Sequence, residues 1–231
     1  MIAFIPARGG SKELKNKNIK IFAGKPLIAH TITEALNSKL ISKVLVLTDS
    51  QKIAEISKKY GATVPFLRPK YLAKDNSNVV DTYLYFLKKM KLNKNYENFI
   101  VLQPTSPIRT RKEIDKAIKF FTKNKATSLV SVCKNKFPLN WAKSIKTVKG
   151  LNYIKNLSKN NNLNRQSYKD VYVPNGNIYI ININKFLKYK TYYFNNTLAF
   201  IMNEKYSIYY NDIDNKFHFY LSEIIFKNKK L

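Results

Sequence analysis

Two short segments, far apart in the sequence, carry residues whose chemistry suits a polyphosphate. The first is a run of two glycines, one hydroxyl and two cations: Arg8, Gly9, Gly10, Ser11 and Lys12. Glycines let backbone N–H groups approach an anion closely, an arginine offers a planar fork of donors, and a lysine offers a mobile charge. The spacing matches neither G-x-x-x-x-G-K-[ST] nor G-x-G-x-x-G. Taken alone, the run therefore predicts either a phosphate-binding loop or a tight turn beside solvated lysines.

The second segment places two carboxylates, Asp212 and Asp214, on either side of Ile213. Acidic residues are scarce in this chain, with 14 Asp and Glu against 42 Lys and Arg. On a strand, the i, i+2 spacing puts both carboxylates on one face. Mg²⁺ prefers one or two carboxylates, completed by phosphate oxygens and water. The pair therefore predicts a Mg²⁺ site beside a bound phosphate group, with a polar turn as the simpler alternative.

The elements that must position these residues follow from the spacing of apolar runs between turn residues. Strands are expected at residues 2–5, 44–47, 63–66, 99–102, 128–132 and 178–181, and helices at 26–36, 53–60, 80–90 and 114–121. Their alternation predicts an α/β fold, with an open, mostly parallel sheet and helices on both faces. Ligands bind at the carboxyl ends of such strands, so we expect Pro6–Lys12, Thr48–Ser50 and Gln103–Arg109 to meet on one rim.

The chain has the length of one domain, residues 1–231. The alternation weakens over residues 134–172, which are rich in lysine and asparagine, and we interpret this stretch as an inserted element that leaves the main sheet. Regular structure is expected to return before the last predicted strand. There, Asn175-Gly176 is a dipeptide typical of a hairpin turn.

The net charge is the most unusual feature of the composition, +28 at pH 7. A field of this size attracts nucleic acids, anionic membranes and phosphorylated small molecules alike. The lysines are scattered through every segment, which disfavours a dedicated nucleic-acid surface. No apolar stretch is long enough to cross a bilayer, and no leader is expected. The single cysteine, Cys133, fits a cytoplasmic protein and a small, buried apolar position.

The glycine run belongs to the stretch IPARGGSK, and seven further characteristic stretches follow it along the chain. In order, they are GKPLIAHTI, VLVLTDS, RPKYLAKD, VLQPTSPIRT, RQ, YVPNGNIYII and DID. In this register the sequence resembles the acylneuraminate cytidylyltransferases, also called CMP-sialic acid synthetases, from residue 1 to about residue 221. The resemblance implies a Rossmann-like, mononucleotide-binding fold and a homodimer whose inserted element crosses to the partner subunit. It also implies Mg²⁺-dependent transfer of CMP from CTP to the anomeric hydroxyl of a nonulosonic, sialic-type acid, with release of pyrophosphate.

The same resemblance assigns residues to the nucleotide. Arg8 and Lys12 match positions that hold the CTP triphosphate, and Asp212 and Asp214 match the metal site, so these four form the expected catalytic set. The expected nucleotide-binding residues are Arg8, Gly9, Gly10, Ser11, Lys12, Lys17, Asn18 and Arg68. A solvated surface position stays open for Lys17, and Asp49 could equally cap the following helix.

The resemblance also assigns residues to the sugar acid. These are Gln103, Thr105, Ser106, Arg109, Arg165, Gln166, Asn175 and Tyr179, with Lys143 as a weaker candidate. An arginine fork such as that of Arg165 would hold the carboxylate of a 2-keto acid through two hydrogen bonds. No residue stands out as the general base. His30 is expected at the surface of a helix, and His218 lies beyond the aspartate pair.

The sequence departs from the family pattern at several positions. Glu13 replaces the glycine that usually follows the Gly-Gly-Ser-Lys run, which puts a carboxylate beside the expected triphosphate. Asn177, His218 and residues 75–81 also differ. The acceptor is therefore left open among N-acetylneuraminate, legionaminate, pseudaminate and the less well matched ketodeoxyoctonate. A basic nucleic-acid-binding protein on a degenerate nucleotidyltransferase scaffold is the alternative from another class.

Overall fold

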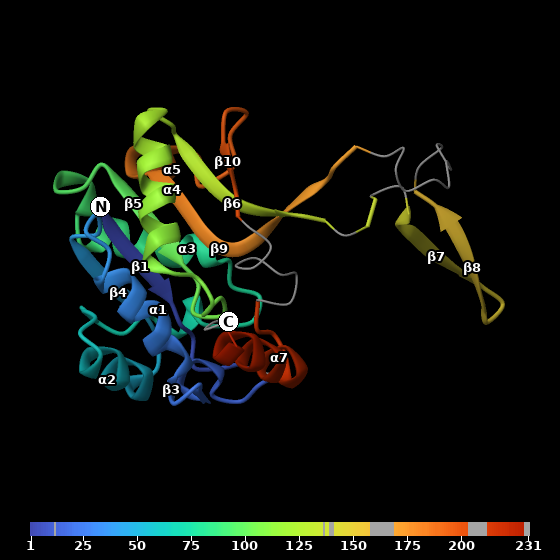
Figure 1. Cartoon of the computed structure of the whole chain (residues 1–231), viewed down its shortest axis with the longest axis horizontal. Helices are drawn as coiled ribbons and strands as arrows, with labels where there is room; N and C mark the ends of the chain where they lie inside the picture. Colours follow the sequence, from blue (N-terminus) through green and yellow to red (C-terminus); the bar gives the residue numbers. More distant parts are fainter. Residues whose placement is uncertain (12, 136, 139–140, 158–168, 203–211, 229–231) are drawn as a thin grey trace.

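The computed structural model describes residues 1–231 apart from 12, 136, 139–140, 158–168, 203–211 and 229–231. A six-stranded sheet forms its centre, with the strands β1 (Ile2–Pro6), β4 (Lys43–Leu47), β5 (Asn98–Leu102), β6 (Ser128–Lys134), β9 (Tyr172–Asn182) and β10 (Leu198–Ile201). Their order is β10-β6-β9-β5-β1-β4 (Figure 1). β1 runs parallel to β4 and β5, and β10 runs parallel to β6. Only β9 is antiparallel to its neighbours in this sheet, so the predicted mostly parallel sheet is confirmed.

Helices cover both faces of the sheet. They are α1 (Leu27–Leu36), α2 (Gln51–Lys59) and α4 (Arg111–Lys123) on one face, and α3 (Val79–Lys89) and α5 (Ile183–Tyr189) on the other. In β1, Ala3 and Ile5 pack into the core beneath the first group, whereas Ile2 and Phe4 pack beneath the second. A strand buried on both faces must be apolar at every position, which is why β1 is a continuous apolar run.

The remaining described elements are short or lie at the margins of the sheet. They are η1 (Lys17–Ile19), β2 (Ile21–Phe22), β3 (Lys25–Pro26), η2 (Lys70–Leu72), η3 (Leu92–Lys94), β7 (Lys143–Val148), β8 (Leu151–Asn156) and α7 (Lys216–Lys227). None of the described helices is long and apolar enough to span a bilayer.

A third apolar cluster fastens α7 to the N-terminal part of the chain. Phe219 of α7 packs with Phe22 of β2 and Leu27 of α1. The ring centroids of Phe22 and Phe219 lie 5.4 Å apart, edge to face. Ile213, just before α7, is fully buried in the same cluster. This cluster therefore brings the aspartate segment beside the loop that follows β1 (Figure 1).

β7 and β8 form an antiparallel hairpin outside the main sheet. Val148 pairs with Leu151, and the two residues between them, Lys149 and Gly150, have φ of 49° and 79°. Two positive φ values are what a two-residue type I′ turn requires. Figure 1 shows the hairpin projecting beyond the ends of β6 and β9. It falls within residues 134–172, the stretch interpreted as an insertion.

Residues 63–66 do not form the predicted strand. Thr63 makes an isolated parallel bridge to Leu45 of β4. Pro65 follows two residues later and has no N–H to extend the ladder. The apolar run is real, but the proline limits it to one bridge.

Asn175-Gly176 is not a hairpin turn, so this interpretation is also wrong. The dipeptide lies inside β9, where the register against β6 shifts between Val130 and Val132. Gly176 has a φ of +70°, which a glycine adopts without strain. β9 pairs with β5 only as far as Ile178, so the irregular stretch before it lies beside β6 alone. A β-bulge bends its strand in this way, and it opens space beyond the end of β5.

Candidate active site

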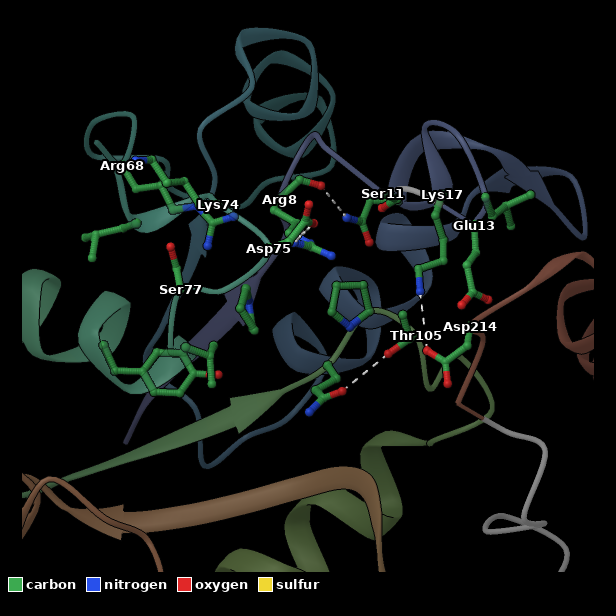
Figure 2. A pocket seen from close by; sticks show the side chains of 18 residues that line it. Arg8, Ser11, Glu13, Lys17, Arg68, Lys74, Asp75, Ser77, Thr105 and Asp214 are labelled. Carbon is green, nitrogen blue, oxygen red and sulfur yellow. Dashed lines mark hydrogen bonds and ion pairs between the residues drawn. The ribbon is translucent and has the colours of Figure 1, made fainter. Parts of the chain in front are cut away.

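The carboxyl edge of the sheet opens into a pocket of about 610 Å³, which we call the rim pocket (Figure 2). Pro6 and Arg8 line it beyond β1, and Gln103 and Thr105 line it beyond β5. Arg68 also lines it, and its backbone N–H donates to the carbonyl oxygen of Thr48, beyond β4, at 2.8 Å. The loops after three neighbouring strands therefore meet at the predicted edge.

The glycine loop is held in shape by hydrogen bonds to its backbone. The N–H of Gly9 donates to Asp49 Oδ1 at 3.0 Å, and Asn18 Nδ2 donates to the carbonyl oxygen of Arg8 at 3.0 Å. A Cβ on Gly9 would lie 3.1 Å from the Cβ of Ser50, so a side chain there would crowd the turn. Gly10, by contrast, has open space around it. Gly9 is therefore needed so that the loop can pack closely against Ser50, whereas the position of Gly10 has room for a side chain.

Asp49 is not the cap of the following helix. Ser50 caps α2 instead, because its hydroxyl accepts from the N–H of Ile53 at 3.4 Å. Asp49 accepts from the glycine loop and also lies 3.3 Å from a guanidinium nitrogen of Arg68. Its role is to join the loop after β1 to the segment after β4.

Three cationic side chains line one side of the rim pocket. Figure 2 shows Arg8, Arg68 and Lys74 there, together with the carboxylate of Asp75. Arg8 Nη1 donates to Asp75 Oδ1 at 2.8 Å. Burial lowers the pKa of the Arg68 guanidinium, while nearby Asp49 raises it. Such a concentration of positive charge suits an anion with several phosphate groups.

Lys17 and the aspartate segment meet on the other side of the rim pocket. Lys17 Nζ donates to the carbonyl oxygen of Ile213 at 2.5 Å and lies 3.7 Å from Asp214 Oδ1. Figure 2 shows Lys17, Asp214 and Glu13 close together, with Ser11 next to them. The N-terminal cations and Asp214 of the distant acidic pair therefore face the same pocket.

The aspartate pair lies in a loop, so the prediction that it sits on a strand is wrong. Ile213 is fully buried, and its N–H donates to the carbonyl oxygen of Thr105 at 2.9 Å. The chain must then turn into α7, where Asn215 Oδ1 accepts from the N–H of His218 at 2.9 Å and caps the helix. Anchoring of the central isoleucine leaves Asp214 to line the rim pocket and Asp212 to line a second pocket, whereas a strand would have placed both carboxylates on one face.

Asp212 is mostly buried, and burial raises the pKa of its carboxyl group. The nearby Asp214 adds to this increase, whereas a hydrogen bond from Thr105 and the positive charge of Lys17 oppose it. His218 also lowers the pKa of Asp212, so the histidine lies near the acidic pair. A carboxylate in such surroundings gains by contact with further positive charge.

A second pocket, of about 250 Å³, lies beside the bulge of β9, and we call it the bulge pocket. Its lining consists of Gln103, Cys133, Val173, Pro174, Asn175, Gly176, Tyr179 and Asp212. Gln103 lines both pockets, and the two aspartates divide between them, with Asp212 here and Asp214 in the rim pocket. The predicted sugar contacts Gln103, Asn175 and Tyr179 therefore gather in one place.

Arg109 does not line either pocket, which argues against the predicted direct contact with a sugar. Its side chain is buried, with guanidinium nitrogens donating to the carbonyl oxygen of Asn177 at 2.6 Å, to Thr31 Oγ1 at 3.0 Å and to the carbonyl oxygen of Gln103 at 3.2 Å. Ser106 is buried as well and lies close to Gly176. Arg109 thus holds the backbone of Gln103, which lines the bulge pocket.

Three of the predicted site residues, Lys12, Arg165 and Gln166, lie outside the described residues. Lys143 is the first residue of β7, on the hairpin that projects from the body (Figure 1). It therefore lies far from both pockets of its own chain.

His30 is buried, so its predicted surface position is wrong. Its Nε2 lies 2.7 Å from the carbonyl oxygen of Phe22, and its ring packs edge to face on Phe22 and Phe226. Burial lowers its pKa. The apolar face of α1 is wider than the helical spacing suggested, because α7 covers the side that carries His30.

Several lining residues were not singled out from the sequence. Lys74, Asp75 and Ser77 line the rim pocket after η2, and Tyr83 of α3 lines it as well. The stretch RPKYLAKD, which contains Lys74 and Asp75, was part of the resemblance and could have indicated the first two. Tyr83 carries no such signal, because an aromatic residue on a helix is most often a core residue.

A mostly parallel sheet with cationic and acidic side chains at its carboxyl edge is an arrangement typical of nucleotidyltransferases. The solved CMP:2-keto-3-deoxy-manno-octonic acid synthetase complexed with CTP has the same fold, with a TM-score of 0.70, 14% identity and coverage of 100% of this chain and 99% of that one. The cytidylyltransferase family profile matches residues 2–226, and the chain belongs to this family.

Two relatives illustrate the family. The CMP-N,N'-diacetyllegionaminic acid synthase of Legionella pneumophila is 36% identical over 213 residues, which are 88% of this chain and 87% of that protein. The N-acylneuraminate cytidylyltransferase of Escherichia coli O18:K1:H7 is 36% identical over 231 residues, which are 99% of this chain and 52% of that protein. The chain therefore spans about half the length of the Escherichia coli relative. The predicted family and enzyme class are confirmed.

Proposed function

We propose that the chain transfers CMP from CTP to the anomeric hydroxyl of a nonulosonic, sialic-type acid and releases pyrophosphate. The observation that carries this proposal is the approach of Lys17 to Asp214, 3.7 Å, where the glycine-loop segment meets the acidic pair. Cations beside carboxylates at one pocket suit a nucleoside triphosphate bound with a divalent ion. The relatives named for diacetyllegionaminate and N-acylneuraminate support the choice of acid class.

Asp212 and Asp214 are the residues that would hold Mg²⁺. Asp214 lines the cationic rim pocket, Asp212 lines the bulge pocket, and the two carboxylates interact electrostatically. Such a pair fits an ion that takes one or two carboxylates and completes its shell with phosphate oxygens and water. Within the described part of the chain, no group of three or more His, Cys, Asp and Glu gathers as a metal cage would require. When bound, Mg²⁺ would supply positive charge against the phosphate oxygens.

The residues of the rim pocket would bind and orient the triphosphate. Arg8 offers a fork for two phosphate oxygens, and Lys17 offers a point charge. In-line transfer needs the attacking hydroxyl and the leaving pyrophosphate on opposite sides of the α-phosphate. We place the triphosphate in the rim pocket and the acid in the bulge pocket, with Gln103, which lines both, beside the α-phosphate.

We also propose that the protein works as a homodimer in the cytoplasm and that the inserted element reaches the partner's acceptor site. Ile145, Leu151 and Ile154 on the β7–β8 hairpin are 60%, 62% and 73% exposed, an apolar surface that is costly to leave in water. A hairpin carrying Lys143, and leading on to Arg165 and Gln166, could bring positive charge to the acid of a second subunit. Ile154→Lys should convert a dimer to a monomer in light scattering, and a wild-type monomer would overturn this arrangement.

The proposed reaction is tested by measuring pyrophosphate release from CTP and Mg²⁺ with a panel of acids. N-acetylneuraminate, N,N'-diacetyllegionaminate, pseudaminate and ketodeoxyoctonate cover the candidate acceptors. We expect release with at least one acid, a loss of release with EDTA, and a loss of at least about 100-fold in Asp212→Asn. No release with any acid, together with salt-sensitive RNA binding, would favour the nucleic-acid-binding alternative.

A further inference from the structure

The helix α7 exposes apolar side chains on its outer face. Phe217, Tyr220 and Ile224 are 67%, 47% and 57% exposed. Their i, i+3 and i+7 spacing places all three on one face of the helix, and we call them the α7 stripe. An apolar surface of this kind marks a place where a protein meets another surface.

The packing of α7 on the body does not account for the stripe. The inner face of the helix is formed by Phe219 and Phe226, whose rings both pack edge to face on Phe22 of β2 with centroids 5.4 Å apart. The core cluster therefore explains these two aromatic residues. The stripe lies on the opposite face, so α7 is apolar on both sides, which is the pattern of a helix with apolar surroundings on both sides.

Another surface helix of the same chain has the ordinary pattern. α2 also covers the sheet with a buried face formed by Ile53 and Ala54. Its exposed positions are all polar or charged: Gln51, Lys52, Glu55, Lys58 and Lys59. The apolar outer face of α7 is thus not a general consequence of the composition of this chain.

Lysines border the stripe. Lys216 and Lys227 are the other exposed residues of α7, and Lys216 Nζ lies 5.9 Å from the ring centroid of Tyr220. The acid of this helix, Glu223, is neutralised locally, because its Oε1 lies 3.2 Å from Lys227 Nζ and accepts from the N–H of Ala23 at 2.8 Å. The outer face of α7 therefore combines apolar groups with positive charge.

This combination fits an anionic lipid surface better than a protein partner. Protein interfaces favour arginine and are depleted of lysine, whereas both exposed cations of α7 are lysines. Helices that lie in the headgroup region of a bilayer combine aromatic and aliphatic residues with lysines, whose ammonium groups stay among the headgroups. The net charge of +28 adds long-range attraction to any anionic membrane.

We propose that α7 docks the protein on an anionic lipid surface, with the α7 stripe in the boundary between headgroups and acyl chains and with Lys216 and Lys227 among the headgroups. The helix has 12 residues and stays packed on the body, so the contact is a reversible, peripheral one. The inference goes beyond the proposed function and does not depend on it, because docking can be measured without CTP or a sugar acid.

Sedimentation of the full chain with lipid vesicles tests the docking. We expect binding to phosphatidylcholine vesicles that contain about one-third phosphatidylglycerol to be at least about tenfold tighter than binding to pure phosphatidylcholine, and to weaken as salt is added. Absence of binding to the anionic vesicles would overturn the inference. The release of pyrophosphate from CTP is a separate measurement, so the proposed function would stand or fall on its own.

The double variant Phe217→Gln and Ile224→Gln tests the apolar part of the contact. Both side chains are exposed, so the Tm should stay close to that of the wild type, whereas affinity for the anionic vesicles should fall about tenfold or more. Ile201→Gln is the matched control, because Ile201 is 61% exposed and lies on β10, away from α7 (Figure 1). Equal affinities for the double variant and the control would contradict the docking.

A second pair of variants separates a docking face from diffuse attraction. Lys216→Gln with Lys227→Gln removes two charges beside the stripe, and Lys185→Gln with Lys188→Gln removes two exposed charges from α5. The first pair should weaken vesicle binding about tenfold, and the second pair should have little effect. The same loss for both pairs would show attraction by net charge alone and overturn the inference.

The stripe could instead contact a second copy of the chain, and light scattering without lipid distinguishes this outcome. If α7 docks on lipid, the variant Phe217→Gln and Ile224→Gln should have the mass of the wild type. A lower mass, together with unchanged vesicle binding, would make the stripe a contact between subunits and the lipid inference wrong.

Discussion

Lys17 Nζ lies 3.7 Å from Asp214 Oδ1 and donates to the backbone carbonyl of the residue before it, Ile213, at 2.5 Å. The contact joins the loop after the first strand to a segment almost at the other end of the chain. It depends on two anchors, since Ile213 is buried in the cluster under α7 and bonded to the carbonyl of Thr105. The contact therefore positions positive and negative groups side by side at the mouth of one pocket.

Lys17→Met should weaken CTP binding. A charge-assisted hydrogen bond to a phosphate oxygen contributes about 1.5–3 kcal/mol, so kcat/KM for CTP should fall by about 10- to 100-fold. Lys15→Met is the control, because Lys15 is exposed and does not line the rim pocket. Steady-state kinetics at varied CTP concentration measures both. If both variants kept the wild-type KM for CTP, Lys17 would not contact the nucleotide.

Asp75→Asn should tighten CTP binding, because Asp75 competes with phosphate for the Arg8 guanidinium. The Arg8–Asp75 pair is 2.8 Å long, and the two side chains are 39% and 46% exposed. Exposed pairs of this kind contribute about 0–1 kcal/mol, so the loss should cost little stability and lower the KM for CTP by up to about fivefold. A thermal melt and a CTP titration separate the two effects. A raised KM would show that Asp75 helps to shape the phosphate site.

Glu13→Gln tests the departure from the family pattern at the glycine loop. Glu13 lines the rim pocket and lies on the same side as Lys17 and Asp214 (Figure 2). Removal of its charge should lower the KM for CTP severalfold at low ionic strength and have little effect at 1 M salt, where the Debye length is about 3 Å. Glu55→Gln, on the exposed surface of α2, serves as the control. A rise in the Mg²⁺ concentration needed for half-maximal activity would instead make Glu13 part of the metal site.

Arg109→Met should destabilise the fold much more than it weakens sugar binding directly. Burial lowers the pKa of the guanidinium to about 9, and three oxygen acceptors hold it in place. Loss of the three bonds should cost about 3 kcal/mol in all, which corresponds to a fall in Tm of about 6–12 °C for a chain of this size. Arg111→Met, at the exposed start of α4, is the control. A normal Tm with a raised KM for the acid would restore the direct contact predicted from the sequence.

The sheet and its rim could be predicted because their signals are local. β1, β4 and β5 are continuous apolar runs, as strands buried on both faces must be, and turn residues mark their carboxyl ends. The bulge of β9 could not be predicted in the same way. It depends on a register shift against β6, and that shift is a property of two strands distant in sequence.

The errors at the site share a physical cause, which is that tertiary packing decided what local spacing could not. Arg109 reads as an exposed cation after a strand, yet three acceptors from separate segments surround it. The aspartate pair lies in a loop and not on a strand, and burial of Ile213 between the two residues fixes the segment. Cys133 was correctly expected to be buried, but its place on a pocket wall depends on the bend of β9.

Acid should loosen α7 through the buried His30. The histidine is packed against Phe22 and Phe226, with its Nε2 2.7 Å from the carbonyl oxygen of Phe22, and burial lowers its pKa below the ordinary 6.5. The unfolded chain therefore binds a proton more readily than the folded one, so stability is full above the ordinary pKa and declines as pH falls through it toward the lowered value. Melts between pH 8 and pH 5 should show Tm falling by several degrees, and His30→Gln should flatten that fall. Equal slopes for wild type and variant would mean that other groups govern the acid response.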